Sequence, residues 1–424
     1  MNGLRILVVG SGAREHALAW RLAGEDGVAR VIVAPGNPLM RVLADVRSGV
    51  GADDFDALLR LCLDEHVDLV VVGPEAPLVA GLADRLRAAG VACFGPSAAA
   101  AQLEGSKSFA REVCRAAGVP MAKGRAFASA FAAIEYAAEL GLPLVVKADG
   151  LAGGKGVTMC ATLSEAERAI RVALEVGQSV VIERFLAGYE ASVIAICDGT
   201  RALGLPVARD HKRLLEGDRG PNTGGMGAYS PLPEVDDARL ADVMKTIFEP
   251  VLVHMAERGT PFRGALFAGL MLTDEGPRVL EFNARFGDPE TQAILPRLVD
   301  PLWPLLLAAA TGSLQGCGPI TATSEATVAL TLAADGYPAT PRGNDEIRGI
   351  DEARQHGALV FGAGVASDDG GVLVTAGGRV LTVVGRGSDL AQAADAAYGS
   401  AELIDFAGKQ LRRDIGRTPT QVSA

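Results

Sequence analysis

A segment rich in glycine and lysine, VVKADGLAGGKGV at residues 145–157, has the composition of a phosphate-binding loop. Glycine lets backbone N–H groups approach phosphate oxygens, and a lysine ammonium adds a compact positive charge. Seven of the 40 basic residues are lysines, and two of these, Lys147 and Lys155, lie here. Gly156 follows Lys155, so the spacing is not that of the Walker loop GxxxxGK[ST]. A plain glycine-rich hairpin is the simpler interpretation of such a cluster, but the charged residues further along the chain favour a polyphosphate site.

Polar groups that could complete a nucleotide site follow this loop. The apolar run Val180–Ile182 predicts a short buried strand. Backbone groups that leave a strand end, here at residues 183–186, can pair with an adenine edge, and Glu190 can accept hydrogen bonds from ribose hydroxyls.

A metal site is predicted from the alternating sequence RVLEFN at residues 278–283. In a strand, Glu281 and Asn283 point to one face, and Leu280 and Phe282 point to the other. A carboxylate and an amide oxygen suit Mg²⁺, which keeps its remaining positions for phosphate and water. The charged residues just beyond the strand make an ordinary solvated face the weaker interpretation.

The segment Gly10–Glu15 begins like the dinucleotide fingerprint GxGxxG, but Glu15 replaces the third glycine. The second predicted strand ends in Ala34-Pro35-Gly36 without a ribose-binding acid. We therefore predict a site for a single phosphate at a helix N-terminus. Asn37 and Glu75 follow neighbouring strands, where ligands of open α/β sheets bind, although Glu75 alone is equally consistent with a role in its loop.

The elements that would position these groups fall into an α/β pattern. Residues 5–9, 31–33, 69–72 and 91–94 read as strands and residues 14–23, 55–65 and 78–89 as helices, which predicts an open parallel sheet. From about residue 327, apolar stretches at 328–332, 359–361, 373–375 and 380–384 predict a small mixed sheet closed by a helix at 390–403.

Composition indicates a soluble globular protein of about three domains. A net charge of -11 argues against nucleic acid as a partner. The six cysteines are scattered without a C-x-x-C pair, which fits a reducing cytoplasm. No apolar run approaches the length of a membrane span, and the N-terminal apolar stretch is too short for a signal sequence, so we expect no membrane association.

Longer motifs resemble one known family over nearly the whole chain. They are GSGAREHALAW at 10–20, GPEAPL at 73–78, QLEGSK at 102–107, KADGLAGGKGV at 147–157, DHKR at 210–213, GPNTGGMGAYSP at 220–231, EFNARFGDPET at 281–291 and RRDIG at 412–416. Their wording and order are similar to those of the glycinamide ribonucleotide synthetases, phosphoribosylamine–glycine ligases of the ATP-grasp superfamily. The resemblance implies a phosphoribosylamine-binding α/β domain at 1–103, an ATP-grasp region at 104–326 with a lid at about 122–187, and a C-terminal domain at 327–424.

The resemblance also implies a reaction. Glycine attacks ATP to give glycyl phosphate, and the amine of 5-phosphoribosylamine then forms the amide. By this resemblance, Arg285, Lys147, Asp210 and Lys212 are catalytic, and Glu281 and Asn283 hold Mg²⁺ or Mn²⁺. ATP is bound by Lys107, Lys147, Gly150, Gly153, Gly154, Lys155, Gly156, Glu183, Arg184, Phe185, Leu186 and Glu190. The acceptor substrates are contacted by Gly10, Ser11, Gly12, Arg14, Glu15, Asn37, Glu75, Asn222, Thr223, Gly224, Gly225, Met226 and Asp288.

Two other functions remain open. A different ATP-grasp carboxylate–amine ligase would keep Lys107, Lys147 and Glu281 but need not have the GPNTGGMGAYSP segment. A non-catalytic nucleotide sensor would be expected to lose the metal ligands or Arg285, and this chain has both. We expect a monomer or a dimer.

Overall fold

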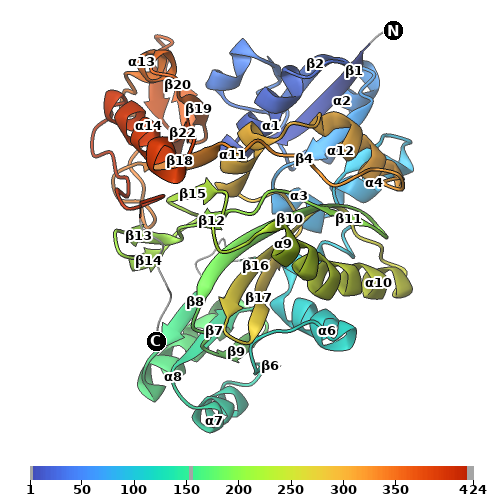
Figure 1. Ribbon diagram of the computed structural model, residues 1–424, viewed down its shortest axis with the longest axis vertical. Coiled ribbons are helices and arrows are strands. Elements are labelled where there is room, and N and C mark those ends of the chain that lie inside the picture. Colours follow the sequence, from blue (N-terminus) through green and yellow to red (C-terminus); the bar gives the residue numbers. More distant parts are fainter. Residues whose placement is uncertain (1–2, 152–155, 418–424) are drawn as a thin grey trace.

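The computed structural model describes residues 3–151 and 156–417. Figure 1 shows its four larger sheets: an N-terminal sheet at the top, a central sheet, a smaller sheet at the bottom, and a C-terminal sheet at the upper left. Among the helices of the described residues, none combines the length and the hydropathy that crossing a membrane requires.

The N-terminal sheet has five parallel strands in the order β3-β2-β1-β4-β5, as the sequence predicts. These are β1 (Leu4–Gly10), β2 (Val28–Pro35), β3 (Asp45–Val46), β4 (Leu69–Val72) and β5 (Cys93–Phe94). Residues 6–9 of β1 and all of β4 are continuous apolar runs because both faces of the sheet are buried there. The helices that follow the first strands are α1 (Ala13–Ala23), the 3-10 turn η1 (Pro38–Val42) and α2 (Phe55–Asp64).

The helix predicted at 78–89 is instead two short helices, α3 (Glu75–Val79) and α4 (Leu82–Ala88). Gly81 separates them with a φ of +93°. This left-handed conformation ends a helix and is inexpensive only for glycine. The earlier start of α3 places Glu75 in its first turn, beside the edge of the sheet.

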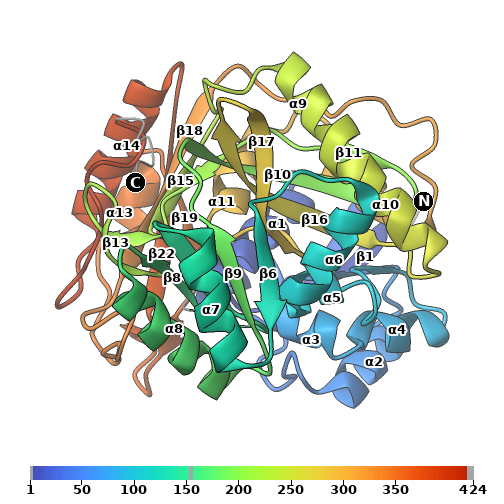
Figure 2. The ribbon, with the colours of Figure 1, turned by 90° about the horizontal axis from the view of Figure 1, so that it is seen from below.

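The smaller sheet, which we call the lid, is antiparallel with the order β6-β9-β7-β8. Its strands are β6 (Gly124–Phe127), β7 (Leu144–Ala148), β8 (Val157–Cys160) and β9 (Val180–Arg184). α7 (Ala130–Leu140) and α8 (Leu163–Val176) pack together on it (Figure 2), and each begins at a side-chain cap, Ser129 and Thr162. The buried lid side chains, such as Leu144 and Ile182, form a hydrophobic cluster of their own.

The central sheet is also antiparallel, in the order β11-β10-β16-β17. It contains β10 (Tyr189–Asp198), β11 (Ala202–Gly204), β16 (Arg263–Thr273) and β17 (Gly276–Asn283). The helices of this region are α5 (Gln102–Gly105), α6 (Lys107–Ala117), α9 (Asp237–Val243), the π-helical turn η2 (Met244–Phe248), α10 (Glu249–Glu257), α11 (Glu290–Ile294), the 3-10 turn η3 (Leu295–Arg297) and α12 (Leu302–Thr311).

The C-terminal sheet has the order β12-β15-β18-β22-β19 and takes strands from two distant parts of the chain. β12 (Arg209–Asp210) and β15 (Gly227–Ser230) join β18 (Ala326–Ala333), β22 (Arg379–Gly387) and β19 (Leu359–Gly362). All its pairings are antiparallel, which corrects the prediction of a mixed sheet. The remaining elements are the hairpin β13 (Arg213–Leu215) and β14 (Arg219–Asn222), the pair β20 (Val365–Ser367) and β21 (Leu373–Thr375), α13 (Ile350–Gln355) and α14 (Leu390–Leu403).

Candidate active site

A cavity of about 620 Å³ lies between the lid and the central sheet. It brings together most of the side chains that the sequence singles out. Those that line it are Glu75, Lys107, Lys147, Gly150, Gly156, Glu183, Arg184, Phe185, Leu186, Glu190, Asp210, Lys212, Asn222, Thr223, Gly224, Glu281, Asn283, Arg285 and Asp288.

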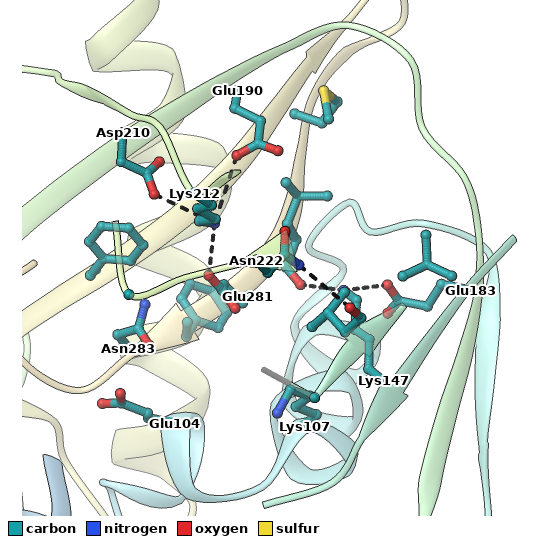
Figure 3. Close-up of a pocket in the computed structure, with 18 of the residues that line it drawn as sticks. Glu104, Lys107, Lys147, Glu183, Glu190, Asp210, Lys212, Asn222, Glu281 and Asn283 are labelled. Carbon is teal, nitrogen blue, oxygen red and sulfur yellow. Dashed lines mark hydrogen bonds and ion pairs between the residues drawn. The ribbon is translucent and has the colours of Figure 1, made fainter. Parts of the chain in front are cut away.

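Lys212 lies among three carboxylates in this cavity (Figure 3). Its Nζ is 3.1 Å from Glu281 Oε1, 3.7 Å from Glu190 Oε2 and 4.0 Å from Asp210 Oδ2. Burial alone would lower the pKa of Lys212, but the carboxylates outweigh it and raise this pKa well above its ordinary value. Lys212 in turn lowers the pKa of Glu281 to about 2. Burial, together with the neighbouring carboxylates of Asp210 and Glu281, raises the pKa of Glu190.

Lys147 is buried at the junction of the lid and the central sheet. Its Nζ donates to Leu280 O at 2.8 Å and forms an ion pair with Glu183 Oε2 at 2.6 Å (Figure 3). Glu183 also pairs with Arg111 on α6 at 2.6 Å. Glu183 is predicted to bind ATP, but its carboxylate is occupied by two cations of the chain and orients Lys147.

Asp149 joins the start of the glycine-rich segment that follows β7 to the N-terminus of α6. Its Oδ1 accepts from the backbone N–H groups of Lys107 at 2.6 Å and Gly150 at 3.0 Å, and its Oδ2 accepts from the hydroxyls of Ser108 and Ser179. Burial opposes ionisation, but these hydrogen bonds prevail and lower the pKa of Asp149. The Lys107 ammonium donates to Gly150 O at 3.0 Å. Gly150 has a φ of +104°, so the loop leaves β7 in a conformation suited to glycine.

Arg184, at the end of β9, and the next two residues, Phe185 and Leu186, line the cavity. The N–H groups of Arg184 and Phe185 donate to Lys123 O and Pro143 O. An adenine edge placed here would accordingly have to pair with other backbone groups of this segment.

Glu281 and Asn283 lie on β17, as predicted, but the strand does not alternate regularly. Gly269 pairs with Glu281 and Leu270 with Val279, so Leu280 forms a bulge. The bulge brings Leu280 to the cavity wall beside Glu281. The described residues contain no group of three or more His, Cys, Asp or Glu side chains that could hold a metal. Two oxygen donors on one strand at the cavity wall nevertheless fit Mg²⁺, which takes its remaining ligands from phosphate and water.

Arg285 forms ion pairs with Glu75 Oε2 at 3.1 Å and Glu104 Oε1 at 3.2 Å. Burial opposes its charge, but these two glutamates raise the pKa of Arg285 above its ordinary value. Glu104 is anchored through Oε2, which accepts from the backbone N–H of Ala284 at 2.7 Å. α3, α5 and the segment after β17 therefore meet at one guanidinium.

A second cavity, of about 460 Å³, lies over the N-terminal sheet. It is lined by Gly10, Ser11, Gly12, Pro35, Ala52, Pro74 and the charged residues Arg14, Glu15, Glu75, Arg285, Asp288 and Arg379, together with Gly224. Glu75, Gly224, Arg285 and Asp288 also line the first cavity, so the two cavities adjoin at these residues.

Glu15 explains why the loop at residues 10–15 is not a dinucleotide-binding loop. Its Oε2 accepts from Gly12 N at 2.7 Å, and its Oε1 accepts from Arg14 Nε at 2.5 Å. A Cβ at Gly10 or Gly73 would lie 2.6 or 2.0 Å from the Glu15 side chain. The carboxylate thus fills the space under the loop and takes one of the amides that a pyrophosphate would need.

Some predicted residues do not reach either cavity lining. Asn37 Nδ2 donates to Ser11 O and Gly362 O, both at 2.8 Å, so its amide joins the N-terminal and C-terminal sheets. Met226 is buried in the core, and Gly225 packs against Pro289. A substrate contact for these three has no support in this placement. Gly153, Gly154 and Lys155 lie outside the described residues.

The chain matches the N, ATP-grasp and C domain models of phosphoribosylglycinamide synthetase over residues 4–104, 105–291 and 327–418. The chain belongs to this family. Phosphoribosylamine–glycine ligases of Caulobacter vibrioides and Synechocystis sp. are 46% and 45% identical to it, over 98% and 97% of this chain and 98% and 99% of theirs.

Solved structures agree with this family membership. The phosphoribosylamine–glycine ligase of Thermotoga maritima is 34% identical, with a TM-score of 0.84 over 97% of this chain and 100% of that one. The biotin carboxylase domain of the 2-oxoglutarate carboxylase of Hydrogenobacter thermophilus, at 16% identity and a TM-score of 0.70 over 97% and 92%, shares the fold.

Six charged residues that line these cavities received no role from the sequence: Glu104, Arg209, Arg213, Asp218, Glu290 and Arg379. Glu104 and Glu290 lie inside the quoted motifs QLEGSK and EFNARFGDPET, which could have identified them. Glu290 is buried within 3.2 Å of Ser192 Oγ, and burial together with Asp210 raises the pKa of Glu290 to about 7. Arg379 comes from β22, outside every motif, and donates to Gly224 O and Asp288 O.

Proposed function

We infer that the chain is a ligase that uses ATP to join glycine to 5-phosphoribosylamine, giving glycinamide ribonucleotide, ADP and phosphate in purine biosynthesis. The choice of substrates rests on its similarity, over nearly the full length, to phosphoribosylamine–glycine ligases. The structural observation that carries the proposal is the junction of two cavities at Glu75, Gly224, Arg285 and Asp288. An activated acid formed in one cavity can meet there an amine held in the other.

We propose that the reaction proceeds in two steps. A carboxylate oxygen of glycine attacks the γ-phosphorus of ATP, which forms glycyl phosphate and releases ADP. The amine nitrogen of phosphoribosylamine then attacks the acyl carbon, the C–N bond forms, and phosphate leaves with the C–O bond electrons. Neither step needs a side-chain nucleophile, so orientation and charge neutralisation supply the catalysis.

We place ATP in the first cavity. Lys107 and Lys147 neutralise ATP phosphates, and the loop bounded by Gly150 and Gly156 covers them. Glu183 positions Lys147 through their ion pair. The backbone from Arg184 to Leu186 faces the adenine, and Glu190 accepts from the ribose. We retain Gly153, Gly154 and Lys155 as expected phosphate contacts.

The metal side uses Glu281 and Asn283. When bound there, Mg²⁺ or Mn²⁺ would neutralise phosphate charge and hold the transferring group in line. Lys212 keeps Glu281 ionised. Its ammonium also lies beside the carboxyl groups of Asp210 and Glu190 and orients them for the incoming substrates.

The acceptor side uses the second cavity and its junction with the first. Arg14 and the amides of Gly10 and Ser11 hold the 5-phosphate, while Gly12, whose N–H donates to Glu15, contributes to the shape of the loop. Arg285, fixed by Glu75 and Glu104, stabilises negative charge on the acyl phosphate. Asp210, Asn222, Thr223, Gly224 and Asp288 surround glycine and the ribosyl amine.

We further propose domains at 1–103, 104–326 and 327–424, a lid at about 122–187, a monomeric or dimeric state, and action in the cytoplasm. The family matches at 4–104, 105–291 and 327–418 support the boundaries. All six cysteines are free thiols, which fits a reducing compartment.

Product analysis tests the reaction. ATP turnover to ADP and phosphate should require both glycine and phosphoribosylamine. Release of AMP and pyrophosphate, or equal turnover with alanine or glutamate in place of glycine, would contradict the proposal and favour a different ligase. Nucleotide binding without any turnover would favour a sensor.

A further inference from the structure

The motif RRDIG at 412–416 lies far from the cavity lining in sequence, yet its first arginine is among the largest fully buried side chains of the molecule. Arg412 Nη1 contacts Asp218 Oδ1 at 2.6 Å and Arg213 O at 3.2 Å. Its Nε and Nη2 bind the Asp414 carboxylate at 2.8 and 2.6 Å. A fully buried guanidinium with these partners is strongly constrained in position.

The partners of this motif lie on the hairpin β13–β14. Asp414 Oδ2 accepts from Gly217 N at 2.9 Å, and Glu216 Oε1 accepts from Arg413 N at 3.2 Å. Residues 216–218 form the hairpin tip, where Gly217 and Asp218 both have positive φ. The motif thus holds every residue of the tip.

The motif is itself firmly attached to the C-terminal sheet and its helix. Ile415 is fully buried, and its N–H and C=O both bond to the hydroxyl of Tyr398 on α14. The hairpin, in contrast, has mostly exposed residues and only two paired positions, Arg213 with Asn222 and Leu215 with Arg219. A two-stranded hairpin without a core is marginal alone, so its position depends on outside contacts.

The base of the hairpin is part of the cavity wall. Lys212 O accepts from both Thr223 N at 2.7 Å and Thr223 Oγ1 at 2.8 Å. His211, which precedes Lys212, faces Asp218 with 3.7 Å between Nδ1 and Oδ1. Burial opposes ionisation of Asp218, but His211 and Arg412 lower the pKa of this carboxyl to about 2, so it stays charged.

The hairpin also contacts the lid. Asn222 Nδ2 lies 3.5 Å from Val157 O on β8, and Figure 1 shows the hairpin between the C-terminal sheet and the lid strands. We propose that Arg412 and Asp414 form a clasp that fixes this hairpin, and that Arg412 is a positioning residue for Lys212 and the adjoining cavity wall. The catalytic part of this inference rests on the proposed ligase reaction.

The test compares Arg412→Met and Asp414→Asn with Arg413→Met in the full chain. Arg413 is the matched control because its side chain is exposed and pairs with Glu402 on α14. Amide hydrogen exchange in residues 214–222 should accelerate about ten-fold or more in the first two variants and stay unchanged in the third. Asp414 lines neither cavity, so its effect cannot come from lost substrate contact.

Steady-state kinetics supply the second readout. kcat should fall about ten-fold or more in Arg412→Met and Asp414→Asn, while KM for ATP changes less than about threefold, because Lys107 and the 184–186 backbone are held by other contacts. Combining the two substitutions should add little to Arg412→Met. Unchanged exchange in the hairpin with unchanged kcat, even at a lowered Tm, would overturn the clasp.

The hydrogen-exchange and kinetic measurements test the clasp and the proposed reaction separately. If the unmodified chain forms no amide, the reaction is wrong, and the exchange measurement still decides whether the clasp exists. If Arg412→Met does not fold, Asp414→Asn decides the outcome, since it retains the Arg412–Asp218 pair.

Discussion

At the scale of single residues, the cavity contains cations that are already paired within the chain. Lys147 is held by Glu183 and Leu280 O, and Lys212 lies among three carboxylates. Pairing holds each ammonium in place without a ligand, which is the condition for electrostatic catalysis without reorganisation. A neighbouring carboxylate therefore orients the cation as well as neutralising it.

Lys147→Met should separate the catalytic and structural roles of this residue. Turnover should fall by two to three decades, which corresponds to about 3–4 kcal/mol of transition-state stabilisation. Stability should change much less than the roughly 3–5 kcal/mol expected for an orphaned buried charge, because Glu183 retains Arg111 at 2.6 Å. Lys123→Met, which removes an exposed lysine of the same region, should alter neither quantity. Near-normal kcat in Lys147→Met at saturating ATP would refute the assignment.

At the scale of elements, the sequence predicts the helices and strands whose residue pattern is local. The parallel sheet, β17 and α14 follow from apolar runs and helical periodicity, and most of the site residues predicted between Lys107 and Asp288 reach one cavity. Asn37 was predicted as a substrate contact because its strand-end position resembles a ligand site, whereas in the structure its amide joins two sheets. Arg379 was missed because nothing near it in the sequence indicates that β22 reaches Asp288. The bulge at Leu280 also depends on pairing with a distant strand.

The junction of the lid loop with α6 yields a prediction for Asp149→Asn. The amide retains the shape but loses the negative charge at a helix N-terminus and one acceptor facing N–H and O–H donors. Unfolding free energy should fall by about 1–3 kcal/mol in urea titrations. KM for ATP should rise, because Lys107 and Gly150 lose their common anchor. A stability loss with unchanged KM for ATP would limit Asp149 to a structural role.

At the scale of the whole molecule, the N-terminal and C-terminal sheets meet at α1. Gly362 N donates to His16 Nδ1 at 2.8 Å, and the His16 ring packs edge-on against Phe361. Burial, aided by Arg354, lowers the pKa of His16 to about 3. The contact between the two sheets thus requires the neutral imidazole.

This arrangement predicts acid sensitivity of the interface. Between pH 6.5 and about 3 the unfolded chain binds a proton at His16 that the folded chain does not, so stability should fall as pH drops through this window. His16→Asn keeps an acceptor near the Nδ1 position and cannot be protonated. The Tm of the unmodified protein should therefore decline more steeply from pH 6.5 to 4 than that of the variant, in calorimetry at matched ionic strength. Parallel Tm curves would show that His16 does not control the acid response.

The C-terminal sheet also imposes an order on folding during synthesis. β15 pairs with β18, and β18 pairs with β22, so Asp210 and Lys212 lie beside a strand whose partners emerge from the ribosome much later. The N-terminal sheet needs only the first 94 residues and can form while the rest is being translated. The segment that carries Lys212 must wait until β22 is complete at Gly387 and, if the clasp is correct, until Asp414 has left the tunnel. A nascent chain stalled before residue 387 should accordingly protect its N-terminal sheet from protease but leave residues 209–230 open to cleavage.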